Sequence, residues 1–357
     1  MPVSRESIVQ GAKILRDGGL VAFPTETVYG LGADAFNPCA LAKIFDVKKR
    51  PHFDPLIIHI STIDSLYKIA DFSEIKNDVK EKLFLLAENL WPGPLSIIVP
   101  KNKNIPGIAT AGSRTVAVRV PDNDTALKLI SLSSGAVAAP SANPFGSLSP
   151  TKAEHVRDSL GDKVDLIIDG GPARIGIEST VIDITGTRVK ILRPGGAPRE
   201  AIEKLIGQVD DKAYNEQSAN NEERSFSSPG QLKSHYAPDK PLFVLEKNEI
   251  INQPYNKNNA YIFFDMSSRN AWHENIKEKI KPEDLNWFTR NNNCKILSDS
   301  GDVLEAASRL FEILHVIDKS EVEKIFAELA PSHGLGEAIN DRLRRGAIKN
   351  KISSKKK

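Results

Sequence analysis

The chain has 357 residues, of which 40% are hydrophobic, which is enough for two ordinary domains with separate cores. Lys and Arg number 48 and Asp and Glu 46, and the resulting net charge of +2 excludes an acidic disordered chain and a bulk-basic nucleic-acid coat protein. Two distant cysteines, Cys39 and Cys294, exclude a disulfide framework and a cysteine-based zinc site. The N-terminus lacks the apolar core of a signal peptide, and no apolar run approaches the ~20 residues of a membrane helix, so we expect a cytoplasmic protein.

Hydrophobic periodicity over residues 1–207 predicts a first domain in which helices and strands alternate irregularly. This mixed order predicts an α/β fold whose sheet is not purely parallel. The predicted helices are Ser4–Asp17, Pro38–Val47, Asn77–Leu90, Asp124–Ser131 and Lys152–Leu160. The predicted strands are Leu20–Phe23, Leu56–Ile60, Leu95–Val99, Val116–Val120, Ala136–Ala139, Leu166–Ile168, Thr180–Ile184 and Lys190–Leu192.

A polar stretch rich in Asn, Glu and Ser, residues 208–228, predicts a linker to a second domain. We divide the chain into a catalytic domain (1–207), a linker with a lid segment (208–239), a smaller α/β domain (240–346) and a basic disordered tail (347–357). The regular alternation in the second domain predicts three layers. Its predicted elements are strands at Leu242–Leu245, Tyr261–Phe264, Lys295–Leu297 and Lys324–Leu329 and helices at Asn275–Ile280, Val303–Ile317 and Gly336–Arg345.

The common catalytic motifs are missing from the sequence. It contains no GxxxxGK[ST] phosphate loop, no complete dinucleotide fingerprint, and no GxSxG, HExxH or CxxC. An enzyme with this sequence therefore needs another means of binding phosphate.

Several segments rich in Gly, Pro, Ser and Thr follow predicted strands, where functional loops usually lie. Each of them is also compatible with a plain turn or helix cap. Arg119 ends an apolar strand and is either half of a buried ion pair or an anchor for a carboxylate. Lys48 and Arg50, at what we expect to be an exposed helix end, either complement the helix dipole or bind a polyphosphate. His59, alone on a strand, is more typical of a core or surface position.

In order along the chain, the motifs resemble the YrdC-like family over about residues 10–206. They are PTETVYGLGADAF, KxRP followed by PLIIHI, WPGPLS, VAVRVP, APSAN, SPT, GIEST and LRPG. The linker, HYAP and the C-terminal GLGEAINDRLRRGA resemble the long, two-domain threonylcarbamoyl-AMP synthases. The resemblance implies a twisted, mixed YrdC-like sheet with helices, followed by a smaller Rossmann-like domain.

The resemblance also implies a reaction. L-Threonine, bicarbonate or CO2 and ATP, which brings Mg²⁺, give L-threonylcarbamoyladenylate and pyrophosphate by adenylyl transfer. A separate transferase then uses this product to modify tRNA next to the anticodon. A site for such chemistry excludes water and neutralises phosphate charge, and it needs no covalent nucleophile.

Site residues follow from the matching motif positions. Threonine binding is implied for Thr27, His59, Arg119 and Ser179, with Arg119 on the carboxylate. ATP binding is implied for Lys48, Arg50, Thr115, Ser141, Asn143, Ser149, Arg193 and Tyr236. Lys48 and Arg50 are expected to stabilise phosphate charge in the transition state. Tyr236 belongs to the segment Ser228–Pro238, which we expect to close over the nucleotide as a lid.

The sequence departs from the family pattern at two positions. Asp54 stands where some relatives have asparagine, and a carboxylate beside ATP is repelled unless Mg²⁺ lies between them. A direct nucleotide contact of Asp54 is therefore not expected. Ala139 replaces a hydroxyl residue of some relatives and offers only packing.

Two other functions stay open. One is an RNA-binding module without catalysis, to which the five lysines among residues 346–357 would add weak tRNA binding. The other is a carbamoyltransferase that uses carbamoyl phosphate, as in hydrogenase-maturation proteins with YrdC-like domains. Those proteins also carry an acylphosphatase unit and CxxC zinc fingers, and this sequence has neither.

Overall fold

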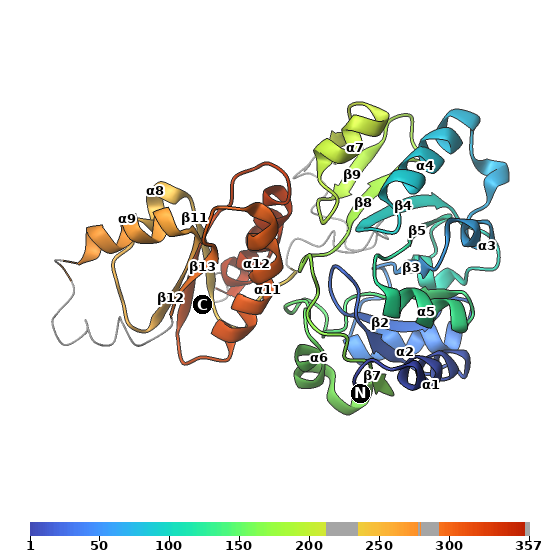
Figure 1. Ribbon diagram of the computed structural model, residues 1–357, viewed down its shortest axis with the longest axis horizontal. Coiled ribbons are helices and arrows are strands. Elements are labelled where there is room, and N and C mark those ends of the chain that lie inside the picture. Colours follow the sequence, from blue (N-terminus) through green and yellow to red (C-terminus); the bar gives the residue numbers. More distant parts are fainter. Residues whose placement is uncertain (212–234, 278, 280–292, 354–357) are drawn as a thin grey trace. The chain divides into compact units, whose positions relative to one another are not determined.

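A computed structural model describes residues 1–211, 235–277, 279 and 293–353 of the chain (Figure 1). These residues form two compact units. The first comprises residues 1–145, 149–174 and 178–211, and the second comprises residues 146–148, 175–177 and those from 235 onward. Among the described helices, none combines the length and apolar character needed to cross a membrane.

The first unit is built on one large sheet with helices. Its longer helices are α1 (Arg5–Arg16), α2 (Pro38–Lys48), α4 (Asn77–Leu90), α5 (Asp124–Leu132), α6 (Ala153–Leu160) and α7 (Arg199–Ile206), with a single turn, α3, at Leu66–Ile69. Its strands are β1 (Val21–Phe23), β2 (Gly30–Asp34), β3 (Ile57–Ile60), β4 (Leu95–Pro100), β5 (Thr115–Arg119), β6 (Ala136–Ala138), β7 (Leu166–Ile167), β8 (Thr180–Asp183), β9 (Lys190–Arg193) and β10 (Asp210–Asp211).

The sheet has ten strands in the order β10-β9-β8-β4-β5-β3-β6-β2-β1-β7. Strands β3 and β5 pair in parallel, as do β4 and β8, whereas β4 and β5 are antiparallel. The sheet is therefore mixed, as the irregular order of elements in the sequence predicts.

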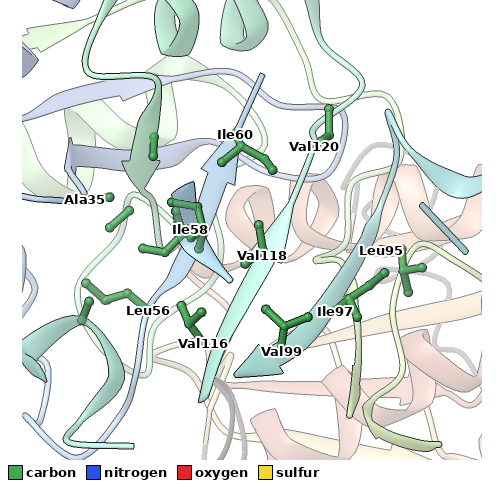
Figure 2. Close-up of a cluster of buried hydrophobic side chains, with 14 of the residues drawn as sticks. Ala35, Leu56, Ile58, Ile60, Leu95, Ile97, Val99, Val116, Val118 and Val120 are labelled. Atoms are coloured by element: carbon green, nitrogen blue, oxygen red, sulfur yellow. The ribbon is translucent and has the colours of Figure 1, made fainter. Parts of the chain in front are cut away.

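The two faces of the sheet differ. Successive side chains of a strand point to opposite faces. Figure 2 shows Ile58, Val118 and Ile97 in the main core. The same core includes residues of α2, α4 and α7. On the other face, α1 and α5 pack against β1 and β6 in a second cluster. Further along that second face, Ile57, Ala117 and Val181 belong to a small apolar cluster.

The second unit has a parallel sheet of four strands in the order β11-β14-β12-β13. Tyr261 and Phe263 pack against Trp272 of α9, while Ile262 between them points to the opposite face. Figure 1 shows the strands between α9 on one side and α11 and α12 on the other, so the unit has three layers. The elements are β11 (Leu242–Leu245), α8 (Lys247–Ile250), β12 (Asn259–Asp265), α9 (Met266–Ile276), β13 (Cys294–Ser298), α11 (Val303–Asp318), β14 (Lys324–Glu328) and α12 (Gly336–Ser353).

The fold class predicted from the sequence is confirmed, but several elements differ. The prediction misses β2, because Gly30–Asp34 consists mostly of small residues without the alternation of a strand. Of the helix predicted at Asn275–Ile280, the first two residues end α9 (Met266–Ile276), residues 277 and 279 are turns, and residues 278 and 280 lie outside the described residues. Helix α12 continues to Ser353 and includes most of the segment predicted as a disordered tail. Most of the predicted linker and lid, at 212–234, lies outside the described residues.

Candidate functional site

Polar side chains gather on the second face of the large sheet, from β3 to β8. His59 and Arg119 lie opposite each other in the parallel pair β3 and β5. Ser96 on β4 points to the same face, and Ser179 immediately precedes β8. All four residues are buried. The pairing of the strands thus brings together three of the four residues predicted to bind threonine.

Arg119 ends β5 and is held from three sides. Its Nε donates to the carbonyl of Gly93 at 3.1 Å, and its Nη1 donates to the hydroxyl of Thr27 at 3.0 Å. Its Nη2 lies 2.5 Å from Oε1 of Glu26, which forms a buried ion pair with it. Arg119 therefore does take part in a buried ion pair. Because the guanidinium has five N–H donors, it also keeps donors for a carboxylate ligand.

Thr27, the fourth residue predicted to bind threonine, lies in the loop between β1 and β2. Thr25 gives its one hydroxyl hydrogen to the carbonyl of Val28 at 2.6 Å. The 2.8 Å contact between the Thr25 and Thr27 hydroxyls therefore has Thr27 as its donor. The Thr27 oxygen in turn accepts from Arg119, so this hydroxyl orients the arginine.

His59 carries no charge at neutral pH. Burial, reinforced by the positive charge of Arg119, lowers the pKa of His59 to about 3. Its Nδ1 lies 3.3 Å from the carbonyl of Ile57. A neutral imidazole beside Arg119 adds a hydrogen-bonding group without a second positive charge.

Ser179 connects the predicted threonine and ATP residues. Its hydroxyl lies 2.8 Å from that of Ser96. Arg193, which ends β9, donates to the Ser179 carbonyl through Nε and Nη2 and to its hydroxyl at 3.1 Å. Arg193 therefore fixes the orientation of Ser179.

Lys48 is the last residue of α2. Asn37 caps the start of this helix, before Pro38, and Lys49, which follows the helix, adopts the left-handed conformation. Its ammonium is buried and donates to the carbonyls of Ser141 and Asn143, and the backbone N–H of Phe145 donates back to the Lys48 carbonyl at 2.8 Å. Burial lowers the pKa of Lys48 well below its usual value, with a further contribution from the charge of Arg50. Lys48 thus holds the loop that carries Ser141 and Asn143.

Arg50 is buried, so the expectation of an exposed helix end is wrong. Its Nη2 forms a 2.9 Å ion pair with Asp54 and donates to the Pro55 carbonyl, while its Nε donates to the Asp54 carbonyl. The guanidinium thereby closes the turn after α2. The pair also explains how this chain accommodates Asp54, since Arg50 compensates the carboxylate.

The other predicted ATP residues lie in different places. Thr115 begins β5, on the same face as Arg119, and contacts the Ser113 hydroxyl at 2.9 Å. Ser149 donates a short hydrogen bond to Glu178. Tyr236 is the one predicted site residue in the second unit, where Arg342 lies over its ring at 4.7 Å from the centroid.

Two side chains of this face were missed by the sequence analysis, Glu26 and Ser96. Glu26 lies inside the motif PTETVYG, and an acidic residue between two threonines directly after a buried strand was a usable signal. Ser96 carried no such signal, because its contact with Ser179 depends on the pairing of β4 with β8. Ala139, by contrast, packs in an apolar cluster, as its side chain suggests.

Comparisons with known proteins agree with this architecture. Residues 13–195 match the family described as "Telomere recombination", and residues 197–347 match "Threonylcarbamoyl-AMP synthase, C-terminal domain". The threonylcarbamoyl-AMP synthase of Pyrococcus abyssi is 40% identical, over 94% of this chain and 92% of its own length. That of Bacillus subtilis is 38% identical, over 95% and 92%.

The chain belongs to the threonylcarbamoyl-AMP synthase family. Among solved structures, P. abyssi Sua5 in complex with L-threonine superposes with a TM-score of 0.79 at 37% identity and covers 97% of this chain and 95% of that one. The family predicted from the motifs is thus confirmed, and with it an enzymatic rather than a purely RNA-binding role.

Proposed function

We propose that this chain forms L-threonylcarbamoyladenylate from L-threonine, bicarbonate or CO2 and ATP, with release of pyrophosphate. It would thus be a nucleotidyltransferase that transfers an adenylyl group. The observation that carries the proposal is the buried Arg119, held by Glu26, Thr27 and Gly93 beside a neutral His59. A fixed, buried guanidinium with spare donors is suited to the carboxylate of an amino acid.

The threonine part of the site lies on the second face of the sheet. In the proposal Arg119 binds the α-carboxylate, while His59 and Ser179 contact the rest of the amino acid. The apolar cluster of Ile57, Ala117 and Val181 lies on the same face and offers a surface for the threonine methyl group. The L-threonine complex of the related Sua5 supports this substrate.

The ATP part draws on Arg50, Thr115, Ser141, Asn143, Ser149, Arg193 and Tyr236. Lys48 has two roles in the proposal: it holds the loop of Ser141 and Asn143, and it adds positive charge near the phosphates. Arg50 would stabilise the charge that develops as pyrophosphate leaves. Because the threonine carbamate decomposes in free water, enclosure of the reactants is as important as charge.

Mg²⁺ is proposed to arrive with ATP, held mainly by phosphate oxygens. In the part of the chain that the structure describes, no three His, Cys, Asp or Glu side chains gather to hold a metal ion. When bound, the ion would neutralise phosphate charge. Asp54 is already paired with Arg50, so we assign it no ligand role.

The product is proposed to pass to a separate transferase that modifies tRNA next to the anticodon. A mixed anhydride of a carbamate and AMP is unstable in water, so rapid use by a partner enzyme is expected. A cytosolic location stays a prediction, based on the two cysteines, which are both free thiols.

The experiment is to incubate the chain with ATP, L-threonine and carbon-labelled bicarbonate. We expect the label in an adenylate that yields AMP and threonine on breakdown. Incorporation of label from carbon-labelled carbamoyl phosphate, supplied in place of ATP and bicarbonate, would support the carbamoyltransferase instead. Salt-sensitive tRNA binding without any labelled product would support the RNA-binding module.

A further inference from the structure

We propose that Glu26 is the receptor for the α-ammonium group of the amino-acid substrate, so that the Arg119–Glu26 pair binds the zwitterion as a unit. This inference deepens the proposed function and rests on threonine being the substrate. It gives a binding role to a residue that the motif analysis left without one.

Glu26 and Arg119 are both buried. Glu26 is 2% exposed, in the loop between β1 and β2, and Arg119 is 3% exposed at the end of β5. Burying an isolated carboxylate is costly, so a buried glutamate needs a counter-charge and hydrogen bonds. Arg119 supplies the counter-charge, with Nη2 at 2.5 Å from Oε1.

The Glu26–Arg119 pair leaves hydrogen-bonding groups unsatisfied. Among the described residues, neither carboxylate oxygen of Glu26 has a partner in hydrogen-bonding geometry, and the same holds for Nη2 of Arg119. An ionised carboxylate accepts up to about four hydrogen bonds. The pair is therefore balanced in charge but retains unused acceptors on Glu26 and an unused donor group on Arg119.

Glu26 and Arg119 together select one kind of ligand. A ligand for this pair needs an anionic acceptor for Arg119 and a cationic donor for Glu26, close together on one molecule. An α-amino acid zwitterion carries a carboxylate and a three-donor ammonium on the same carbon. A substrate with only a carboxylate would satisfy Arg119 and add a second negative charge beside Glu26.

The surroundings favour this orientation. Thr27 and Gly93 hold two edges of the Arg119 guanidinium, so that group cannot turn away from Glu26 without losing both hydrogen bonds. His59 is neutral and brings no competing positive charge. Among the described residues, Arg119 is the only ion-pair partner within 4.0 Å of Glu26, so an ammonium would be the second cation at this carboxylate.

The test compares L-threonine with its 2-hydroxy counterpart, 2,3-dihydroxybutanoate of matching stereochemistry, which replaces the ammonium with a hydroxyl. Binding of each is measured by titration calorimetry without ATP and bicarbonate. We expect the unmodified chain to prefer threonine by at least ~100-fold, because the analogue leaves Glu26 without its cation. In Glu26→Gln the preference should fall below ~5-fold.

A matched control is Glu328→Gln, which removes a buried carboxylate in the second unit. Its threonine preference should equal that of the unmodified chain. If Glu26 merely holds Arg119 in place, Glu26→Gln would weaken both ligands by the same factor, and an unchanged ratio overturns the proposal. Glu26→Asp, which keeps the charge, should retain a preference above ~10-fold.

Folding of the variant does not limit the test. If Glu26→Gln does not fold, the affinities of the unmodified chain and of Glu26→Asp for the two ligands still test the proposal. Similar affinities of the unmodified chain for threonine and its 2-hydroxy counterpart overturn it. That result, with threonine bound, would leave the proposed function intact. Failure of the unmodified chain to bind threonine at all would instead contradict the proposed function and this inference with it.

Discussion

Two buried glutamates, Glu26 in the first unit and Glu328 in the second, have opposite surroundings. Glu328, at the end of β14, accepts hydrogen bonds from the Phe264 backbone at 2.8 Å and the Ser268 hydroxyl at 2.7 Å, and burial raises its pKa. Glu26 has a counter-charge, Arg119, but no aligned hydrogen bond among the described residues. Burial of a carboxylate alone therefore does not mark a site, whereas unused hydrogen-bonding capacity does.

The same contrast extends to the units as wholes. In the second unit, buried polar groups complete the fold: Asn340 bonds both the N–H and the carbonyl of Ala330, and Asp265 caps α9. In the first unit, His59, Ser96 and Arg119 instead lie on one face of a sheet. We infer that the threonine chemistry belongs to the first unit, whereas Asn340 and Asp265 serve the stability of the second.

Removal of Arg119 should have the largest effect. Arg119→Leu should lower kcat/KM for threonine by ~10³-fold, about 4 kcal/mol, because the carboxylate loses its partner. It should also lower the free energy of unfolding by about 3–5 kcal/mol, because Glu26 is left as an uncompensated buried charge. Pyrophosphate release and urea unfolding followed by circular dichroism measure the two effects.

The double variant Arg119→Leu with Glu26→Gln sharpens this prediction. It should recover much of the stability, since no buried charge remains, and none of the activity. If Arg119→Leu is as stable as the unmodified chain, then Arg119 is not the counter-charge that makes the burial of Glu26 tolerable, and the comparison of the two glutamates fails.

Arg50→Ala should come next. We expect a loss of about 2–4 kcal/mol of transition-state stabilisation, as for a charged donor in a dry site. Unlike an exposed residue, Arg50 should also contribute about 3 kcal/mol to stability through its pair with buried Asp54. The exposed neighbour is the control: Lys49→Gln should change either quantity by less than about 0.5 kcal/mol. Normal turnover in Arg50→Ala would rule out its phosphate role.

His59 should make stability depend on pH. Its pKa in the folded chain is about 3, below its usual 6.5, so the unfolded chain takes up a proton that the folded chain does not. The free energy of unfolding should therefore fall as pH drops from 6.5 towards 3, with this residue contributing up to about 1.4 kcal/mol per pH unit. His59→Gln should reduce that slope between pH 6.5 and 4, and His333→Gln, at an exposed position of the second unit, should not.

Serine should be a poorer substrate than threonine by ~5-fold in kcat/KM, or about 1 kcal/mol, because it lacks the methyl group for which we propose the apolar cluster as the contact surface. The ratio is measured as pyrophosphate release at fixed bicarbonate. Equal kcat/KM values for serine and threonine would show that the cluster of Ile57, Ala117 and Val181 does not select the substrate.

Tyr236→Phe should have the smallest effect. The ring keeps its contacts with Phe311 and Arg342 in the second unit, so the thermal midpoint should change little. Loss of the hydroxyl should raise KM for ATP by ~2–5-fold if it bonds the nucleotide, as the motif implies. An unchanged KM would mean that Tyr236 serves only the packing of the second unit.

Sequence patterns predicted a large part of this arrangement. The motifs named Arg119, His59 and Thr27, and periodicity placed the first two at predicted strands. What the sequence could not give was the partner of each group. The burial of Lys48 depends on a loop almost a hundred residues later, and the Ser96–Ser179 contact on the register of two distant strands. Such long-range pairings leave no local pattern.

The central claim is that the polar face of the first unit binds threonine for an ATP-dependent synthesis. The most direct measurement is pyrophosphate release from ATP, with threonine and bicarbonate omitted in turn and alanine substituted for threonine. We predict release only when both threonine and bicarbonate are present, and little with alanine. Release without threonine at the full rate, or an equal rate with alanine, would contradict the account.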